Sequence, residues 1–191
     1  MQNKIRKMLA VFAVLLSAVL PEARAQQIAI NTDMLMDVAA APNLGVELTL
    51  TKRSTLSVNA LYSPKLAYRF GTVTAVQPEW RYYFSGRPMY RHFVGVGALW
   101  SDYDLKVKGR RYDGNAGGVG VTFGYVLPVG KRLLIDFHTS LGAIFFKQKE
   151  YVNGTDYDAE NMDADGNVRT NAHGTMFLPM RTGVSLTYIL R

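Results

Sequence analysis

The sequence predicts an all-β protein, an eight-stranded antiparallel up-and-down β-barrel of the outer-membrane type. Three observations lead to this class. Eight segments alternate polar and apolar residues with a period of two, and no apolar run after residue 25 is long enough for a transmembrane helix. The connectors between the segments alternate between short and long. The chain has no cysteine, so an exported domain of this size must be held together without disulfides, which a closed barrel achieves by pairing every strand.

The N-terminal residues have the features of a cleaved export signal. Three basic residues precede an apolar run from Met8 to Leu20, and Ala23 and Ala25 form the small-x-small pattern that signal peptidase accepts. The run is closer to the ~7–15 residues of a signal core than to the ~20 that a membrane anchor needs. We therefore predict cleavage after Ala25, with a signal peptide at 1–25 and one barrel domain at 26–191.

The positive charge of the chain comes partly from this signal. The formal net charge is +7, from 22 basic and 15 acidic residues. Four of the basic residues and one acidic residue precede residue 26, which leaves +4 for the rest. This excess does not indicate a nucleic-acid partner. The expected location is the outer membrane of a Gram-negative cell.

The eight alternating segments are the expected strands. Most of them reach the ~9–11 residues that a tilted transmembrane strand needs. Their expected limits are 28–37, 43–51, 55–63, 72–84, 92–103, 117–126, 132–147 and 175–190.

The alternation separates an apolar face from a polar or glycine-rich face. In segment 117–126, for example, Val121 and Phe123 alternate with Gly120 and Thr122. The last segment is expected to carry an apolar face opposite Arg181 and Ser185. That face comprises Met176, Leu178, Met180, Val184, Leu186, Tyr188 and Leu190.

Alternation alone does not say which face is inside, because a soluble lipocalin-like barrel turns the apolar face inward and a membrane barrel turns it toward lipid. The connectors favour the membrane barrel. All the long connectors fall at one end, as the extracellular loops of such barrels do, and only the first connector at that end, 38–42, is short. The long ones are 64–71, 104–116 and 148–174, and those at the other end are 52–53, 85–91 and 127–131.

The last segment also matches an outer-membrane assembly signal. Arg181, Gly183, Leu186 and Tyr188 fit the pattern polar-x-Gly-x-x-apolar-x-apolar near the chain end. This pattern is typical of the strand that the barrel-assembly machinery reads during insertion, so that machinery is an expected partner.

Aromatic residues gather where membrane interfaces are expected. Trp80, Tyr82, Phe84 and Tyr90 lie toward the periplasmic end, and Trp100 and Tyr103 lie toward the extracellular end. Aromatic belts at both interfaces are a feature of membrane barrels.

Several motifs resemble a known family. They are the stretch 30–37, Ala-Pro-Asn-Leu-Gly-Val-Glu at 41–47, Pro-Glu-Trp-Arg-Tyr-Tyr-Phe at 78–84, Phe-Val-Gly-Val at 93–96, and the stretch 124–132. Together they resemble a Bacteroidota family of short outer-membrane barrels, domain of unknown function 3575, over nearly all of 26–191. The resemblance implies an OmpA-like eight-stranded barrel with no known enzyme activity, and an association with surface fimbrial systems.

With the apolar face outward, charged residues fill the lumen. An eight-stranded barrel is just wide enough for side chains to fill it, and buried charges must be paired. We expect Arg81 and Arg181 to bridge Glu47, Glu79 and Asp136, with His138 on the same inner face. Glycines at 95, 97, 118, 120, 124 and 142 leave room for these long side chains. The lumen is therefore expected to be plugged.

Two other functions are compatible with the pattern. Asp136 and His138 share a face and could act as a catalytic pair on lipid or peptide, although nucleophile, base and oxyanion donors cannot all be assigned, so we predict no catalytic residue. A soluble periplasmic carrier of a hydrophobic ligand is the further alternative. Fractionation without detergent separates it from the membrane protein.

The outer loops offer the remaining candidates. Asp156 to Asp165 form an acidic loop, and Asn161-x-Asp163-x-Asp165-Gly166 within it resembles the start of a calcium loop. The twelfth position of that pattern is Ala172, where a calcium loop needs a bidentate Glu, so we predict no metal or cofactor. A looser divalent-cation site is the alternative to a simple solvated acidic loop. The neighbouring loop is basic and could bind lipopolysaccharide or dock on the acidic loop. Its residues are Lys106, Lys108, Arg110 and Arg111. The leading expectation is a non-enzymatic barrel for envelope structure or surface attachment, with lipid, lipopolysaccharide and fimbrial or other surface proteins as partners.

Overall fold

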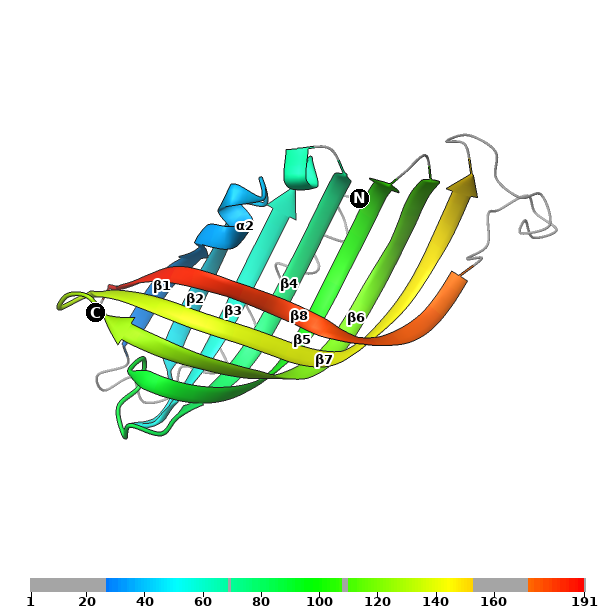
Figure 1. Cartoon of the computed structure of the whole chain (residues 1–191). Coiled ribbons are helices and arrows are strands. Elements are labelled where there is room, and N and C mark those ends of the chain that lie inside the picture. Colours follow the sequence, from blue (N-terminus) through cyan, green and yellow to red (C-terminus); the bar gives the residue numbers. More distant parts are fainter. Residues whose placement is uncertain (1–26, 69, 108–109, 153–171, 191) are drawn as a thin grey trace, which may run out of the picture.

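The chain folds into a closed ring of eight antiparallel strands. The computed structural model describes residues 27–68, 70–107, 110–152 and 172–190. Each strand pairs with its neighbours in chain order, and the first strand also pairs with the last, which closes the barrel (Figure 1). The all-β, up-and-down fold predicted from the sequence is confirmed. The expected signal peptide and the acidic loop at 156–165 lie outside the described residues.

Two short helices join the strands at the end of the ring opposite the tight turns (Figure 1). The elements in chain order are β1 (Ile28–Asp33), α2 (Met34–Val38), β2 (Asn43–Thr49), β3 (Ser54–Ser63), η1 (Leu66–Tyr68), β4 (Gly71–Tyr83), β5 (Arg91–Val107), β6 (Arg110–Pro128), β7 (Leu133–Val152) and β8 (Ala172–Ile189).

The strands differ greatly in length around the ring. β1 has 6 residues and β2 has 7, whereas β7 has 20 and β8 has 18. As a result β8 pairs with β1 only from Ser185 to Ile189. Over the rest of its length, β7 is the only strand of the described chain that pairs with β8. The ring is therefore low on the side of β1 and β2 and tall on the side of β5 to β8.

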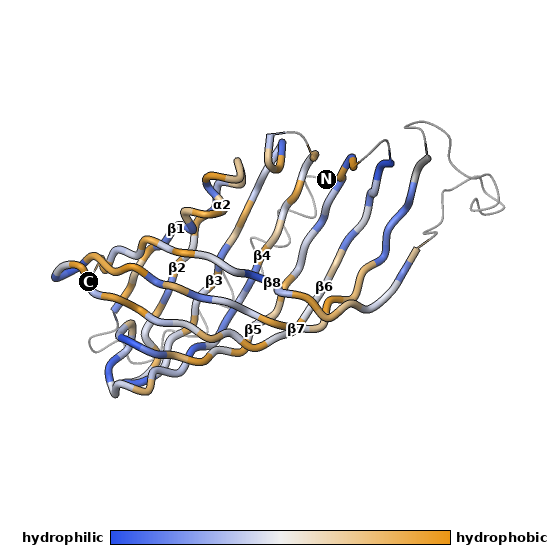
Figure 2. Tube along the Cα trace, viewed as in Figure 1, coloured by the Kyte–Doolittle hydropathy of each residue, from blue (hydrophilic) through white to orange (hydrophobic). Residues whose placement is uncertain are grey.

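The distribution of side chains is inverted relative to a water-soluble protein. Val121, Phe123, Leu141 and Leu186 point away from the interior and are at least 37% exposed. Acids, amides, hydroxyls and arginines are buried inside the ring. Figure 2 shows this alternation of apolar and polar residues along the strands. The period-two pattern thus sets the faces as expected through most of the ring.

Strand pairing extends into two of the expected outer connectors. The stretch 104–116 was predicted as a loop, but β5 and β6 pair through it as far as Val107 and Arg110. Likewise β7 continues to Val152 and β8 begins at Ala172, inside the connector expected at 148–174. Charged residues such as Asp104, Arg111 and Glu150 are frequent in these stretches, and the antiparallel ladders continue through them. Strand pairing therefore extends well beyond the apolar part of each strand.

The first strand is shorter than expected. Strand was predicted to Asp37, but β1 ends at Asp33 and α2 follows. The Asp33 side chain accepts a hydrogen bond from the backbone nitrogen of Leu35 at 3.1 Å, which is the N-cap of this short helix. The carboxylate at the end of the strand therefore turns the chain into α2.

A β-bulge reverses the faces of β8. Ser140 pairs with Arg181 but Leu141 pairs with Pro179, so Met180 is an extra residue in β8. Before the bulge, Met176 and Leu178 pair with Ile144 and Gly142, which are on the inner side of β7. The prediction that Met176, Leu178 and Met180 share the outer apolar face was therefore wrong, because one extra residue shifts the alternation.

The aromatic residues of β5 also divide between the two faces. Trp100 points outward and is exposed. Tyr103 lies three residues later and on the opposite face, where its hydroxyl donates a hydrogen bond to Gln148 Oε1 at 2.8 Å. Trp100 and Tyr103 therefore do not share the outer face, as the expected belt requires, because odd spacing in a strand changes the face.

Inner-facing glycines make room for large side chains, which gives a stability prediction. A Cβ at Gly124 would overlap the Phe93 ring and lie 2.7 Å from the carbonyl oxygen of Phe137, whereas one at Gly117 would approach only Leu99 O, at 3.8 Å. We expect Gly124→Ala to destabilise the protein by about 1–3 kcal/mol. Gly117→Ala, on the outer face of the same strand, should have little effect. Urea unfolding in detergent micelles measures both, and equal effects would contradict this packing.

Candidate functional site

The interior of the ring is closed at the end of the tight turns by a small apolar cluster. Tyr83, Phe93, Val126 and Leu134 come from four adjacent strands and pack there with Ala29 and Met89. The guanidinium carbon of Arg81 lies 4.6 Å from the centre of the Phe93 ring. This apolar cluster, which we call the apolar floor, therefore lies between the tight turns and the charged groups.

Arg81 is the centre of a buried charge cluster. Its Nη1 lies 2.7 Å from Asp136 Oδ2 and 3.3 Å from Glu47 Oε2, and its Nε contacts Glu79 Oε1. Arg81 is 1% exposed. The structure thus brings together Arg81 and all three acids that the sequence placed around it.

Hydroxyl groups complete the hydrogen bonding of these acids. Thr55 and Tyr83 both donate to Glu47 Oε1, at 2.6 and 2.8 Å. Thr122 donates to Glu79 Oε2 at 2.7 Å, and its oxygen lies 2.8 Å from that of Ser140. The alternation placed Thr122 on the polar face, but sequence reasoning assigned none of these hydroxyls to the charge cluster, although each lies at an inner-facing position of its strand. Because the acids are satisfied from several strands, the cluster ties β2, β3, β4, β6 and β7 together across the interior.

A second group of charged side chains surrounds Asp33. His138 Nε2 lies 3.3 Å from Asp33 Oδ2, and Nδ1 lies 3.6 Å from Asp136 Oδ1. Arg181 Nε lies 3.4 Å from Asp33 Oδ2, and Arg181 Nη2 donates to Ser185 Oγ at 3.2 Å. Arg181 was expected to bridge Glu47, Glu79 and Asp136. The ion pair that it forms is instead with Asp33, at the end of β1.

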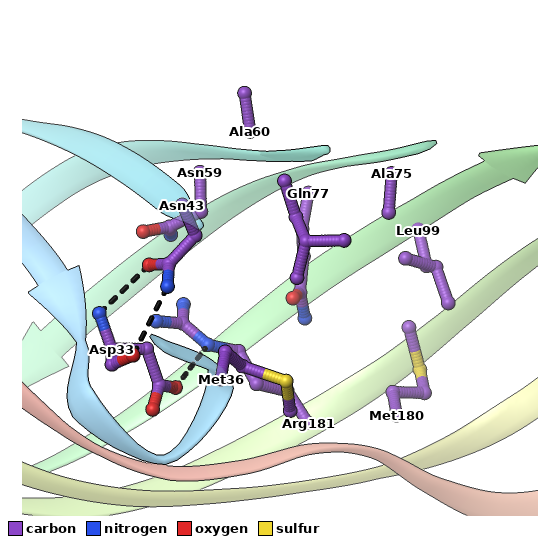
Figure 3. Close-up of a pocket in the computed structure, with 11 residues that line it drawn as sticks. Asp33, Met36, Asn43, Asn59, Ala60, Ala75, Gln77, Leu99, Met180 and Arg181 are labelled. Carbon is purple, nitrogen blue, oxygen red and sulfur yellow. Dashed lines mark hydrogen bonds and ion pairs between the residues drawn. The ribbon is translucent and has the colours of Figure 1, made fainter. Parts of the chain in front are cut away.

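A cavity of ≈ 90 Å³ lies beside Arg181, beneath α2. Figure 3 shows its lining, in which Asp33, Asn43, Asn59 and Arg181 face Leu99 and Met180 across the interior. Asn43 fixes the end of β1, because it accepts a hydrogen bond from Asp33 N at 2.7 Å and donates one to Asp33 O at 3.0 Å. The interior is therefore filled at the turn end and partly open toward the helices.

The residues of the expected assembly signal have distinct places in the fold. Leu186 and Tyr188 are exposed on the outer face of β8, and Arg181 is inside. A Cβ at Gly183 would overlap the carboxylate of Asp33. The glycine of this motif therefore also makes room for the ion pair between Asp33 and Arg181.

The expected basic loop is mostly strand. Lys106, Arg110 and Arg111 lie on the paired ends of β5 and β6, and Lys108 lies outside the described residues. Arg111 donates to both carboxylate oxygens of Asp104, at 2.8 and 2.6 Å. These hydrogen bonds lower the pKa of the Asp104 carboxyl below its usual value of 3.8.

This outer ion pair gives a pH prediction. A carboxyl with a lowered pKa in the folded protein stabilises it above the usual pKa, and the contribution is lost as the pH falls through the folded value. The two side chains are more than one-third exposed, so the contribution should be less than about 1 kcal/mol. Arg111→Gln should therefore lower stability slightly at neutral pH and not in strong acid. Urea midpoints of wild type, Arg111→Gln, Asp104→Asn and the double variant measure this, and a coupling that persists in strong acid would contradict it.

The described residues contain no group of three or more acidic or histidine side chains arranged to hold a metal ion. Among their helices, none qualifies as a membrane span. The Asp136 and His138 side chains are 4% and 1% exposed. A substrate in solution would not reach this pair without opening the ring.

Comparison with known proteins identifies a family for this chain. The model of one family, described as a protein of unknown function (DUF3575), matches residues 11–190. The chain belongs to this family. No curated protein and no solved structure matches it. The family description assigns no activity, so a role has to be argued from the geometry.

Proposed function

We propose that this member of the DUF3575 family is a small, non-enzymatic outer-membrane β-barrel with a plugged lumen, serving envelope structure or surface attachment. The observation that carries the proposal is the inverted distribution of side chains, with apolar residues outside and a paired charge cluster inside. A soluble carrier of the lipocalin type would bury its apolar face instead.

The height of the outer apolar surface supports a membrane location. On β7 the outward positions from Leu133 to Phe145 are apolar or threonine, and the next two are Lys147 and Lys149. Twelve residues span ~40 Å along a strand, or ~30 Å in height at the usual barrel tilt, which is close to the ~25 Å apolar band of membrane barrels. On β5 the outer face likewise changes from apolar to charged beyond Trp100.

Charged residues border this surface at both ends. Arg53, Arg87 and Arg132 lie near the tight turns, and Asp104 and Arg111 lie on the outer parts of β5 and β6. Basic side chains at the borders suit contact with phosphate groups of lipid and lipopolysaccharide, which we propose as partners. Insertion by the barrel-assembly machinery through β8 and contact with fimbrial or other surface proteins through the long strand ends complete the proposed partner set.

The plugged lumen follows from the cluster around Arg81. Five strands send mutually bonded side chains into the centre, and the apolar floor below it is buried. An aqueous pore could open only if these ion pairs and hydrogen bonds were broken and the side chains rearranged. We therefore propose a structural or adhesive barrel rather than a channel, and no catalytic residue.

Cell fractionation tests this proposal. The protein should appear in the outer-membrane fraction, require detergent for extraction, and migrate faster in gels when unheated than when boiled. In planar bilayers it should show no large steady conductance. Recovery in the periplasm without detergent would refute the membrane location, and a large steady conductance would refute the plugged lumen.

A further inference from the structure

The cavity beside Arg181 contains polar atoms that nothing in the described chain satisfies. Both side-chain amide atoms of Asn59 and the Nη1 atom of Arg181 are buried without a hydrogen-bond partner among the described residues. The two residues are 7% and 8% exposed, and both line the cavity. Because buried polar groups are normally hydrogen-bonded, these atoms can take up a partner such as a bound molecule or water.

Asp33, Asn43 and Gln77 also line the cavity, and its remaining lining is apolar. Met36 from α2, Leu99 from β5 and Met180 from the bulge of β8 lie around the cavity with the polar residues (Figure 3). Leu61 from β3 also lines it. Met180 can lie against the wall only because residue 142 is a glycine, since a Cβ at Gly142 would overlap the Met180 sulfur. The cavity therefore has a polar end and apolar walls.

The apolar wall continues beyond the cavity toward the open end of the ring. Register places Met176 and Leu178 on the same side as Ile144 and Gly142, and these two side chains are 47% and 41% exposed. From Arg181 to Met176 the wall extends for about 15 Å along β8. Such a wall offers a binding surface for an extended alkyl chain.

A gap in strand pairing lies beside this wall. β8 pairs with β1 only from Ser185 to Ile189, and the short helix α2 lies against β8 above that point. The inner apolar wall is therefore not separated from the outer apolar face by a complete strand ladder. Met176 and Leu178 are exposed toward the open end of the ring, so an apolar molecule can approach the wall from there.

The charges of the interior select the kind of head group. Four buried acids, Asp33, Glu47, Glu79 and Asp136, face Arg81, Arg181 and a histidine within the described part of the ring. An ionised carboxylate would add to an acidic excess and would meet Asp33, which already pairs with Arg181. Asn59 offers both a donor and an acceptor, which suits a hydroxyl group.

We propose that this cavity and wall bind a single-chain neutral amphiphile of the monoacylglycerol class. Its hydroxyl head lies between Asn59 and Arg181 Nη1, and its alkyl chain follows Leu99, Met180 and Met176. The site is separate from the Arg81 cluster and goes beyond the proposed structural role, since it depends on the geometry of the interior and not on envelope integrity or attachment.

Native mass spectrometry of the full chain, released from a short-chain detergent, tests this proposal with monomyristoylglycerol as the probe. Wild type should retain one molecule. Leu99→Trp fills the cavity and Asn59→Leu removes the polar partners, so each should weaken retention by about tenfold or more. Val96→Trp, on the outer face of β5, is the matched control and should bind as wild type does. Heat-modifiable migration establishes that each variant is folded.

The outcomes separate the possible occupants. Absence of an adduct would mean that water alone satisfies Asn59 and Arg181, and it would overturn the proposal. Retention that both Leu99→Trp and Asn59→Leu leave unchanged would place the lipid on the outer surface and would also overturn it. Preference for ionised myristate over monomyristoylglycerol would refute the neutral head. Each result is independent of the fractionation test, because binding is measured on purified protein.

Discussion

Arg81→Leu should be the most damaging single substitution in the interior. It leaves Glu47, Glu79 and Asp136 buried without the guanidinium that contacts all three. Removing one partner of a buried ion pair typically costs about 3–5 kcal/mol, because the remaining charges stay desolvated. We expect the urea midpoint of refolded protein to fall accordingly, or the heat-modifiable band to be lost.

Matched variants separate the charge from the side-chain volume. Arg81→Lys should also be strongly destabilised, because one ammonium group cannot replace two nitrogens that point to different carboxylates. Adding Glu79→Gln to Arg81→Leu should recover part of the stability by removing one uncompensated charge. Arg132→Leu, at an exposed turn, should change stability by less than about 0.5 kcal/mol. An unchanged midpoint for Arg81→Leu would show that the cluster does not hold the ring together.

Leu141→Arg should have the second largest effect if the outer face meets lipid. Leu141 points outward near the middle of the apolar stretch of β7. An arginine at the bilayer midplane of a membrane barrel costs about 2–4 kcal/mol. The measurement is urea unfolding of protein folded into phosphatidylcholine vesicles, followed by tryptophan fluorescence.

Asn115→Arg provides the control for this prediction. Asn115 is an exposed, outward residue on β6 beyond the apolar stretch, so an arginine there should cost no more than about 1 kcal/mol. In a water-soluble protein both substitutions would place a charge in solvent and have similar small effects. Equal effects at the two positions would therefore argue against lipid contact at Leu141.

Much of the ring could be predicted from sequence because one rule determines it. A period of two fixes which residues share a face, so Arg81 and its three acids could be assigned to the interior without knowing the register. The same rule would also have identified Tyr83, which lies two residues after Arg81 and binds Glu47. Parity, meaning whether a residue stands at an odd or an even position along its strand, is a local property that can be read from a single sequence.

The errors arise where parity fails or does not apply. Nothing in the alternation marks Met180 as an extra residue, and the bulge moves Met176 and Leu178 to the inner side. The partner of Arg181 depends on the relative heights of β1 and β8, which are set by register across the closing seam. Helices of three and five residues, such as η1 and α2, are too short to show a period of 3.6.

The seam between β1 and β8 also bears on how the chain acquires its fold. Residues such as Ala29 and Ile189 pair although they stand at opposite ends of the described chain, whereas every other ladder joins consecutive strands. Hairpin ladders can form from nearby residues, but closing this last one costs the loop entropy of the whole sequence between them. The short β1–β8 ladder should therefore form last during assembly and be the first to exchange its amide hydrogens with solvent.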